Sequence, residues 1–414
     1  MTRIDAARAV LAANDRGGYT VPTDRLYPFQ WNWDSAFVAM GFATYDTARA
    51  LTELERLIDG QWPDGMIPHI VFHAPADSYF PGPEVWGTNR TPATSGITQP
   101  PVFALALAWI AERGGDPTRI ARLYQAAVRH HRWWRTARDP DGTGLVALLH
   151  PWESGRDNSP MWDAPLARVP ETTVTPIRRR DTGHVDQSMR PSDQDYRRYI
   201  HLVDVGRAGG WDPATLWRTM PFRMVEPGVN AILLAADEAL AGLADRYGTA
   251  ADRAEISGWI SRGTAALSTL WSPELGLYRA HDTLTNTGVA VPSSAGLLPL
   301  LTAAPGPSEV TALAATLRRW HAAGQILVPS TPREVSGFDA RRYWRGPVWA
   351  VVNWLIARGL ARHGETELAE LVRADTARLL ERAGFAEYFD PLTGDGLGGD
   401  AFTWTAAVQL LLAA

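Results

Sequence analysis

The sequence predicts an all-α protein in which paired helices form a two-layer toroid with long loops. Apolar residues recur at i, i+3 and i+4 through most of the 414 residues, and this spacing is the period of an amphipathic helix. The expected helices come in pairs joined by alternately short and long loops, and the long loops hold the Trp, Pro and Gly. No repeat of fixed period occurs, which disfavours a solenoid.

Several of the expected helices begin at capping signals. Asp34 and Ser35 follow the W-N-W run, and Asp116 precedes Pro117. Pro347 has the fixed φ that suits the first helical position. The expected helices are residues 3–14, 34–59, 99–113, 116–138, 227–247, 250–270, 308–323, 346–361 and 365–383.

Other signals mark helix ends and short extended pieces. Gly60, Gly114 and Gly384 follow helical runs, as glycines do just past a helix C-terminus. Residues 144–151 and 276–282 follow turn-like sequences and look extended. They predict small hairpins on loops rather than a main sheet.

Residues 158–215 interrupt the helical pattern. They contain PMWDAPLARVPETT, the basic run RRRDTGHVD and MRPSDQDYRRYIHLVD. We interpret them as an insertion between barrel helices that forms a lid over the functional site. The prediction is a single catalytic domain over residues 1–414, with 158–215 as the lid.

Composition excludes several classes of protein. A net charge of −5 and a pI near 6.1 give no basic footprint for nucleic acid. The N-terminus lacks an apolar signal region, and no apolar run reaches the ~18–20 residues of a membrane span. There is no Cys, and the ten His form no metal-binding pattern. We expect a cytoplasmic protein with no cofactor, metal, nucleic acid or membrane partner.

Tryptophan is over-represented, with 18 residues. Filling the core is the plain explanation, because Trp buries a large area. Many Trp nevertheless lie in polar or Gly- and Pro-rich contexts, and we expect several to line a pocket. These are Trp31, Trp33, Trp62, Trp86, Trp152, Trp162, Trp344 and Trp404.

Two isolated carboxylates suggest chemistry. Asp157 lies in E-S-G-R-D-N-S-P and Glu387 in A-E-Y-F, each near aromatic residues. Glycoside hydrolysis needs such a pair: one carboxyl protonates the leaving oxygen, and the other activates water or attacks the sugar. The plainer interpretations are a turn aspartate and an exposed loop glutamate. Asp34, beside two Trp, either caps a helix or contacts a sugar hydroxyl.

Two further segments carry candidate substrate contacts. In R-R-Y-W-R-G-P-V-W, Tyr343 and Trp344 are either an aromatic anchor for the next helix or a sugar platform with Arg345 nearby. In R-P-S-D-Q-D-Y, Arg190 and Tyr196 are either surface polar residues or part of the site.

Four motifs together resemble glycoside hydrolase family 63. They are Y-P-F-Q-W-N-W-D-S (27–35), E-S-G-R-D-N-S-P (153–160), Y-W-R-G-P-V-W (343–349) and E-Y-F-D-P-L-T-G-D-G-L-G…F-T-W-T-A-A (387–407). Within that family they are most similar to the bacterial mannosylglycerate and glucosylglycerate hydrolases. The resemblance runs from near residue 18 to the C-terminus.

The resemblance implies an (α/α)6 barrel and an inverting mechanism. Asp157 matches the general acid of the family and Glu387 its general base. Arg190 and Tyr196 match residues that hold glycerate in the glycerate-specific members. An arginine suits that task because it pairs with a carboxylate through two hydrogen bonds, and an acidic protein needs a local cation to bind an anion. The candidate substrate-binding residues are Tyr27, Gln30, Trp31, Asp34, Gln99, Arg190, Tyr196, Tyr343 and Trp344.

The main hypothesis is an inverting hydrolase that splits 2-O-α-glucosyl- or mannosyl-glycerate into sugar and glycerate. An α-glucosidase that acts on a neutral sugar with the same carboxylates is the alternative. A sugar epimerase on a helical toroid is more distant, because His is sparse in the Trp-rich loops. A non-catalytic sugar-binding protein would not need two loop carboxylates. Glucosyl or mannosyl specificity and a homo-oligomeric state stay open.

Overall fold

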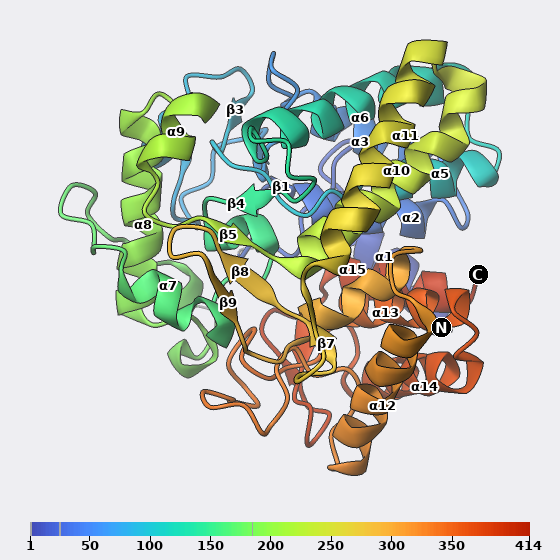
Figure 1. The fold of residues 1–414 in the computed structure, drawn as a ribbon. Helices are drawn as coiled ribbons and strands as arrows, with labels where there is room; N and C mark the ends of the chain where they lie inside the picture. The colour runs from blue at the N-terminus through green and yellow to red at the C-terminus, as the bar shows by residue number, and fades with distance from the viewer. Residues whose placement is uncertain (1, 25, 184) are drawn as a thin grey trace.

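The structure is a computed structural model that describes residues 2–24, 26–183 and 185–414 and is mostly helical (Figure 1). The helices are α1 (Arg3–Ala13), α2 (Asn32–Phe42), α3 (Thr47–Ile58), α4 (Pro83–Trp86), α5 (Phe103–Glu112), α6 (Pro117–Ala137), α7 (Asp163–Ala167), α8 (Asp193–Ala208), α9 (Pro213–Thr219), α10 (Pro227–Tyr247), α11 (Ala250–Ser268), α12 (Pro307–Ala322), α13 (Ala350–Arg362), α14 (Thr366–Ala383) and α15 (Thr403–Leu412).

Six segments form a closed circuit of contacts. Helix α2 packs against α5, α5 against α10, and α10 against the 3-10 segment Ser294–Leu301. That segment packs against α13, α13 against α15, and α15 against α2. Four further helices pack against members of this circuit: α3 on α2, α6 on α5 and α10, α11 on α10, and α14 on α13. The first and last helices, α1 and α15, also contact each other, so the two ends of the chain lie on the same side (Figure 1).

The predicted helix over 34–59 is wrong, because two helices occupy that stretch. Helix α2 ends at Phe42, and Asp46 starts α3 by accepting a 2.9 Å hydrogen bond from the Arg49 amide. An N-cap aspartate four residues after a helix end lets the chain reverse direction. Helix α3 therefore folds back and packs on α2.

The start predicted for the helix at 346 is also wrong. Helix α13 begins at Ala350, and Pro347 lies outside it. The next residue, Val348, exchanges two backbone hydrogen bonds with Phe389, of 2.8 and 2.9 Å. This extended contact joins the 343–349 motif to the segment that follows Glu387.

The segment 158–215, which the sequence predicts to be an insertion, contains more helix than its sequence suggested. It holds α7, α8 and the start of α9, and Ser192 with Asp195 forms a capping box for α8. Helix α15 was also missed. It is buried along most of its length and so lacks the one-sided apolar pattern of a surface helix.

The strands are short, and all their pairings in the described part of the chain are antiparallel. The largest sheet has the order β4-β5-β8-β9, so part of each segment expected to be extended, 144–151 and 276–282, joins one small sheet, while the start of 276–282 pairs with β6 as a separate two-stranded sheet. The strands are β1 (Gln30–Trp31), β2 (Ile70–Phe72), β3 (Ala93–Thr94), β4 (Ala147–Leu148), β5 (Met224–Val225), β6 (Trp271–Ser272), β7 (Leu277–Tyr278), β8 (Ala280–Asp282), β9 (Thr287–Val289), β10 (Tyr388–Phe389) and β11 (Gly396–Leu397).

Helix α10 is long and apolar enough to cross a membrane by length and composition, with a mean hydropathy of 1.2. The expectation that no apolar run reaches this length therefore does not hold. However, 78% of the apolar stretch is buried inside the fold. It packs between α5, α6, α11 and the 3-10 segment 294–301, as a core helix does.

Candidate active site

The residues singled out by the sequence meet at one cavity. The cavity and the open solvent space at its mouth together have a volume of about 710 Å³. Every predicted site residue except Gln30 lines it. The lining residues are Pro22, Tyr27, Trp31, Trp33, Asp34, His69, Tyr79, Phe80, Gln99, Trp152, Gly155, Asp157, Asp181, Arg190, Tyr196, Tyr343, Trp344, Glu387, Phe402 and Trp404.

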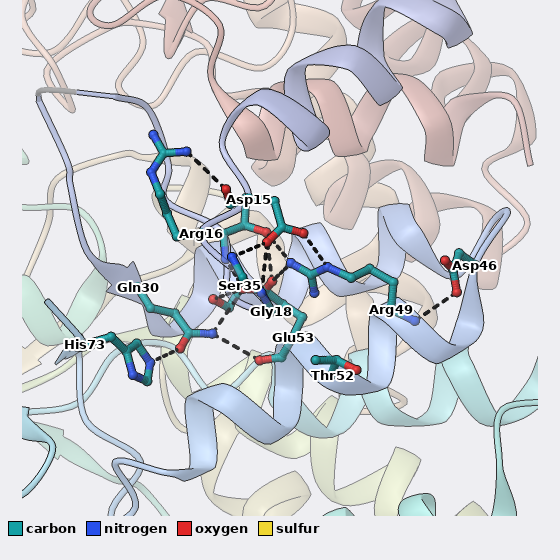
Figure 2. A network of polar contacts seen from close by, with 12 residues as sticks. Asp15, Arg16, Gly18, Gln30, Ser35, Asp46, Arg49, Thr52, Glu53 and His73 are labelled. Atoms are coloured by element: carbon teal, nitrogen blue, oxygen red, sulfur yellow. Dashed lines mark hydrogen bonds and ion pairs between the residues drawn. The ribbon is translucent and has the colours of Figure 1, made fainter.

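Gln30 does not line the cavity, and its side chain belongs instead to a buried network of polar contacts (Figure 2). Its amide nitrogen donates to the Glu53 carboxylate at 3.1 Å, and its amide oxygen lies 2.8 Å from His73 Nε2. Ser35, near the start of α2, also donates to Glu53, at 2.8 Å. Neighbouring residues of a strand face opposite sides. The side chain of Trp31 therefore faces the cavity, while that of Gln30 holds strand β1 in place through its contacts with Glu53 and His73.

Asp157 is held by backbone contacts that leave its carboxyl facing the cavity. It follows the 3-10 turn Pro151–Ser154 and Gly155, and the Tyr199 hydroxyl donates to its carbonyl oxygen at 2.7 Å. Burial raises the pKa of the Asp157 carboxyl to about 7, against the opposing charge of Arg190 and with the help of the Glu387 charge. Such a group still carries its proton in about half of the molecules at pH 7 and in nearly all of them a unit or more lower, as a general acid must.

Glu387 is not the exposed loop residue of the plain interpretation, because only 1% of it is exposed. The Gly399 amide donates to its Oε2 at 3.0 Å, and the Tyr27 hydroxyl donates to its Oε1 at 3.1 Å. Gly398 makes room for it: φ is +74° there, and a Cβ would lie 2.4 Å from Glu387 Oε2. These contacts fix the position of the Glu387 carboxyl at the wall of the cavity.

Arg190 lies against Glu387 rather than free in the cavity. Its Nη1 is 3.5 Å from Glu387 Oε1, its Nη2 donates to the Tyr27 hydroxyl at 2.6 Å, and its Nε is 3.6 Å from Asp181 Oδ2. The guanidinium also lies 4.7 Å from the Tyr343 ring centroid. Only 2% of Arg190 is exposed.

Asp34 is no helix cap. Helix α2 begins two residues earlier, and Asp34 projects from its first turn into the cavity with 5% of its surface exposed. Burial raises its pKa well above the usual range, and the nearby Glu387 and Asp157 charges add to the effect. A carboxyl in this state can both donate to and accept from sugar hydroxyls.

The aromatic wall is built on stacked rings. Trp344 stacks on Trp349 with centroids 3.9 Å apart and planes 2° from parallel, and its backbone amide donates to Asn158 Oδ1 at 2.9 Å. Tyr343 has a φ of +50°, a conformation that a non-glycine side chain rarely adopts and that clusters at functional sites. Arg345 does not reach the cavity, because it pairs with Asp163.

Tyr196 and Gln99 reach the cavity with part of their hydrogen-bonding capacity used. The Tyr196 hydroxyl donates to the Phe80 carbonyl at 2.6 Å, so a ligand acceptor would have to displace that bond. The Gln99 side-chain oxygen accepts from the Trp33 amide at 3.3 Å.

The sequence identified some, but not all, of the other residues that line the cavity. Five of the eight candidate Trp line the cavity, whereas Trp62, Trp86 and Trp162 are buried elsewhere. Asp181 was missed, although it belongs to the basic run of the predicted lid. His69, Tyr79 and Phe80 were missed as well, since nothing in their local sequence distinguishes them. Within the described residues, no group of three or more His, Asp or Glu side chains is arranged to hold a metal ion.

Gly155 is expected to be irreplaceable because it lies between Trp33 and Asp157. Its φ is +67°, and a Cβ would meet Trp33 Cζ2 at 2.6 Å. Gly142 is a matched control: its φ is +68°, and a Cβ there would meet nothing within 4 Å.

We expect Gly142→Ala to cost about 1–2 kcal/mol from the backbone conformation alone. Gly155→Ala should cost about 1–3 kcal/mol more from overpacking, and should also lower kcat. Urea unfolding of both variants measures the difference. Equal losses of stability would show that the Trp33 contact does not constrain this loop.

The chain is similar to known glycoside hydrolases over its whole length. The mannosylglycerate hydrolase MGH1-like glycoside hydrolase domain matches residues 27–405. Mannosylglycerate hydrolase MGH1 of Selaginella moellendorffii is 47% identical over 98% of this chain and 84% of its own length. A glucosylglycerate hydrolase of Mycolicibacterium hassiacum is 37% identical over 98% of this chain and 96% of its own. The crystal structure of the family 63 mannosylglycerate hydrolase from Thermus thermophilus in complex with Tris and D-glycerate covers 100% of both chains, with 45% identity and a TM-score of 0.96.

Proposed function

This chain belongs to the MGH1-like glycoside hydrolases of family 63, and we propose that it cleaves 2-O-α-mannosylglycerate or 2-O-α-glucosylglycerate into the sugar and glycerate. The resemblance seen in the four motifs is thereby confirmed, and the chain is a glycoside hydrolase. The observation that carries the proposal is that one aromatic cavity brings together Asp157, Glu387 and the buried cation Arg190.

The proposed reaction inverts the anomeric carbon. Asp157 donates its proton to the glycosidic oxygen as the bond from that oxygen to the sugar breaks. A water molecule attacks the opposite face of the sugar and gives a proton to Glu387. The raised pKa of Asp157 and the donors around Glu387 support this division of roles. An α-glycoside would release the β-anomer first.

We further propose that the closed circuit of helix contacts is an (α/α)6 barrel. The 3-10 segment 294–301 would take the place of one inner helix. The insertion 158–215 would be a lid within a single domain, because Asp181, Arg190 and Tyr196 reach into the cavity from it. A lid over the site would exclude bulk water and still admit the one attacking water.

Recognition of the glycerate carboxylate would fall to Arg190. The protein has a net charge of −5, so an anion must be attracted by a local cation. Arg190 is the one Arg or Lys side chain among the described residues that lines the cavity. Its Nε and Nη1 are buried and have no hydrogen-bond partner in the described part of the chain. The ring of Tyr196 would form part of the cavity wall, because its hydroxyl already donates a hydrogen bond to the Phe80 carbonyl.

The substrate panel that tests this function contains both glycosylglycerates and the neutral analogue glucosylglycerol. We expect hydrolysis of at least one glycosylglycerate with a much higher kcat/KM than that of glucosylglycerol. Equal or better turnover of the neutral glycoside would favour the neutral-sugar alternative.

Arg190→Lys on the same panel should lower kcat/KM for the glycosylglycerate by roughly 30–1,000-fold, because an ammonium cannot reproduce the guanidinium fork. A smaller loss is expected on glucosylglycerol, since Arg190 also contacts Glu387 and Tyr27. The excess loss on the anion measures carboxylate recognition.

Arg345→Lys is the matched control for this variant. Arg345 makes a two-point contact with Asp163 outside the cavity, at 2.8 and 2.7 Å, so its loss should affect both substrates alike. Identical losses for Arg190→Lys on both substrates would mean that Arg190 only positions Glu387 and does not recognise the carboxylate of the substrate.

A further inference from the structure

Charges of alternating sign link the insertion to the general base. Asp193 accepts from Arg179 Nη1 at 2.9 Å, and Arg179 donates two hydrogen bonds to Asp181, of 3.1 and 2.6 Å. Asp181 Oδ2 lies 3.6 Å from Arg190 Nε, and Arg190 Nη1 lies 3.5 Å from Glu387. Four of these five residues belong to the insertion 158–215.

This chain of charges creates a conflict for an anionic ligand. Four acidic side chains line the cavity together with Arg190: Asp34, Asp157, Asp181 and Glu387. Burial opposes the charged form of Asp181, but Arg179 and Arg190 outweigh it and lower its pKa, so Asp181 is a carboxylate at neutral pH. A carboxylate bound at Arg190 would therefore lie beside another carboxylate, and like charges placed so close repel.

We propose that Asp181 competes with the aglycone carboxylate for Arg190 and thereby promotes release of the acid product. This inference rests on the proposed function of the same site. Asp181 is tethered to the protein, so it returns to Arg190 without an entropic cost of association, whereas glycerate pays that cost. Arg179 holds Asp181 by two hydrogen bonds, so Asp181 keeps a cationic partner while the aglycone occupies Arg190.

Specificity for the aglycone would then come from two opposed residues. Arg190 attracts the carboxylate, and Asp181 limits how tightly it is held. A substrate carries its sugar into the aromatic part of the cavity and gains contacts there, whereas free glycerate has only the Arg190 end. The repulsion from Asp181 acts on both, but it removes a larger share of the binding free energy of the product.

The test is calorimetric binding of D-glycerate, and of neutral glycerol as its uncharged counterpart, to the full-length protein. For Asp181→Asn we expect the Kd of D-glycerate to fall on the order of tenfold, because a like charge has been removed. The Kd of glycerol should stay unchanged. Product inhibition by D-glycerate during glycosylglycerate hydrolysis should strengthen by a similar factor.

Two further variants separate charge from structure. Asp181→Glu keeps the carboxylate and should bind D-glycerate within about threefold of the wild type, as a retained charge implies. Asp193 is the second acidic partner of Arg179; it is exposed and does not line the cavity. Asp193→Asn should therefore leave glycerate binding unchanged.

Each outcome decides between the claims. Weaker or unchanged binding of D-glycerate by Asp181→Asn, in a protein that still hydrolyses glycosylglycerate, overturns this inference alone and makes Asp181 a support of the lid. A tenfold gain that Asp193→Asn reproduces also overturns it, because loosening of the lid would then be the cause. A wild-type protein that neither binds D-glycerate nor cleaves either glycosylglycerate overturns the proposed function and this inference with it.

Discussion

Asp157→Asn is expected to lower kcat on a glycosylglycerate by ~10²–10⁴-fold, the usual contribution of one general acid. The amide keeps the size of the side chain but cannot donate a proton to the leaving oxygen and become an anion. An aryl glycoside with a good leaving group needs less protonation, so it should recover part of the lost rate. Steady-state kinetics on both substrates measures the effect.

The same residue should set the basic side of the pH profile. The Asp157 carboxyl is active when protonated, and its pKa is raised to about 7. Wild-type kcat/KM should therefore be level below about pH 6, be roughly halved near pH 7, and fall by about tenfold per unit at higher pH. The residual activity of Asp157→Asn should lack this fall.

Asp163→Asn provides a matched control in the same segment. Asp163 is half exposed and pairs with Arg345 outside the cavity. The kcat and the pH profile of the Asp163→Asn variant should stay close to those of the wild type. If Asp157→Asn instead turned over the natural substrate at nearly the wild-type rate, Asp157 would not be the acid.

Glu387→Gln is expected to lower kcat by at least ~10²–10⁴-fold as well, because an amide cannot accept the proton of the attacking water. A good leaving group should not rescue this variant, since attack rather than departure is impaired. The different response to the aryl glycoside separates the base from the acid. Substantial recovery on the aryl glycoside would contradict the assignment.

The loss in Glu387→Gln must be shown to be chemical rather than structural. Glu387 accepts hydrogen bonds from Tyr27 and Gly399 and lies against Arg190, so circular dichroism and a melting curve should accompany the kinetics. Glu381→Gln, on an exposed position of α14, is the control for a neutralised glutamate and should retain wild-type activity.

Much of the helical framework could be predicted from the sequence, because the pattern of apolar residues is local. The helix starting after Asp116 and the helix over 227–247 were correct, since capping and periodicity agree there. The break between α2 and α3 was missed because the turn before Asp46 contains neither Gly nor Pro. The late start of α13 depends on a long-range pairing with Phe389, which no local pattern reveals.

The site was predictable wherever a motif carried it. The structure brings Asp157, Glu387 and Arg190 into one cavity although they lie far apart in the sequence. The direction of a side chain was harder to predict, because Gln30 and Trp31 are neighbours that face opposite ways. The contacts between side chains were harder still to predict. Arg190 meets Glu387 and Asp181 only in the folded chain, where segments far apart in the sequence come together at the cavity.

The central claim is that Asp157 and Glu387 hydrolyse a glycosylglycerate with inversion, and proton NMR of the first sugar released tests it most directly. The protein would be incubated in turn with 2-O-α-mannosylglycerate and 2-O-α-glucosylglycerate, and spectra recorded before the free sugar equilibrates. The account predicts that at least one substrate is cleaved and that the β-anomer appears first. Early accumulation of the α-anomer would contradict the assigned roles, and no cleavage of either substrate would contradict the function.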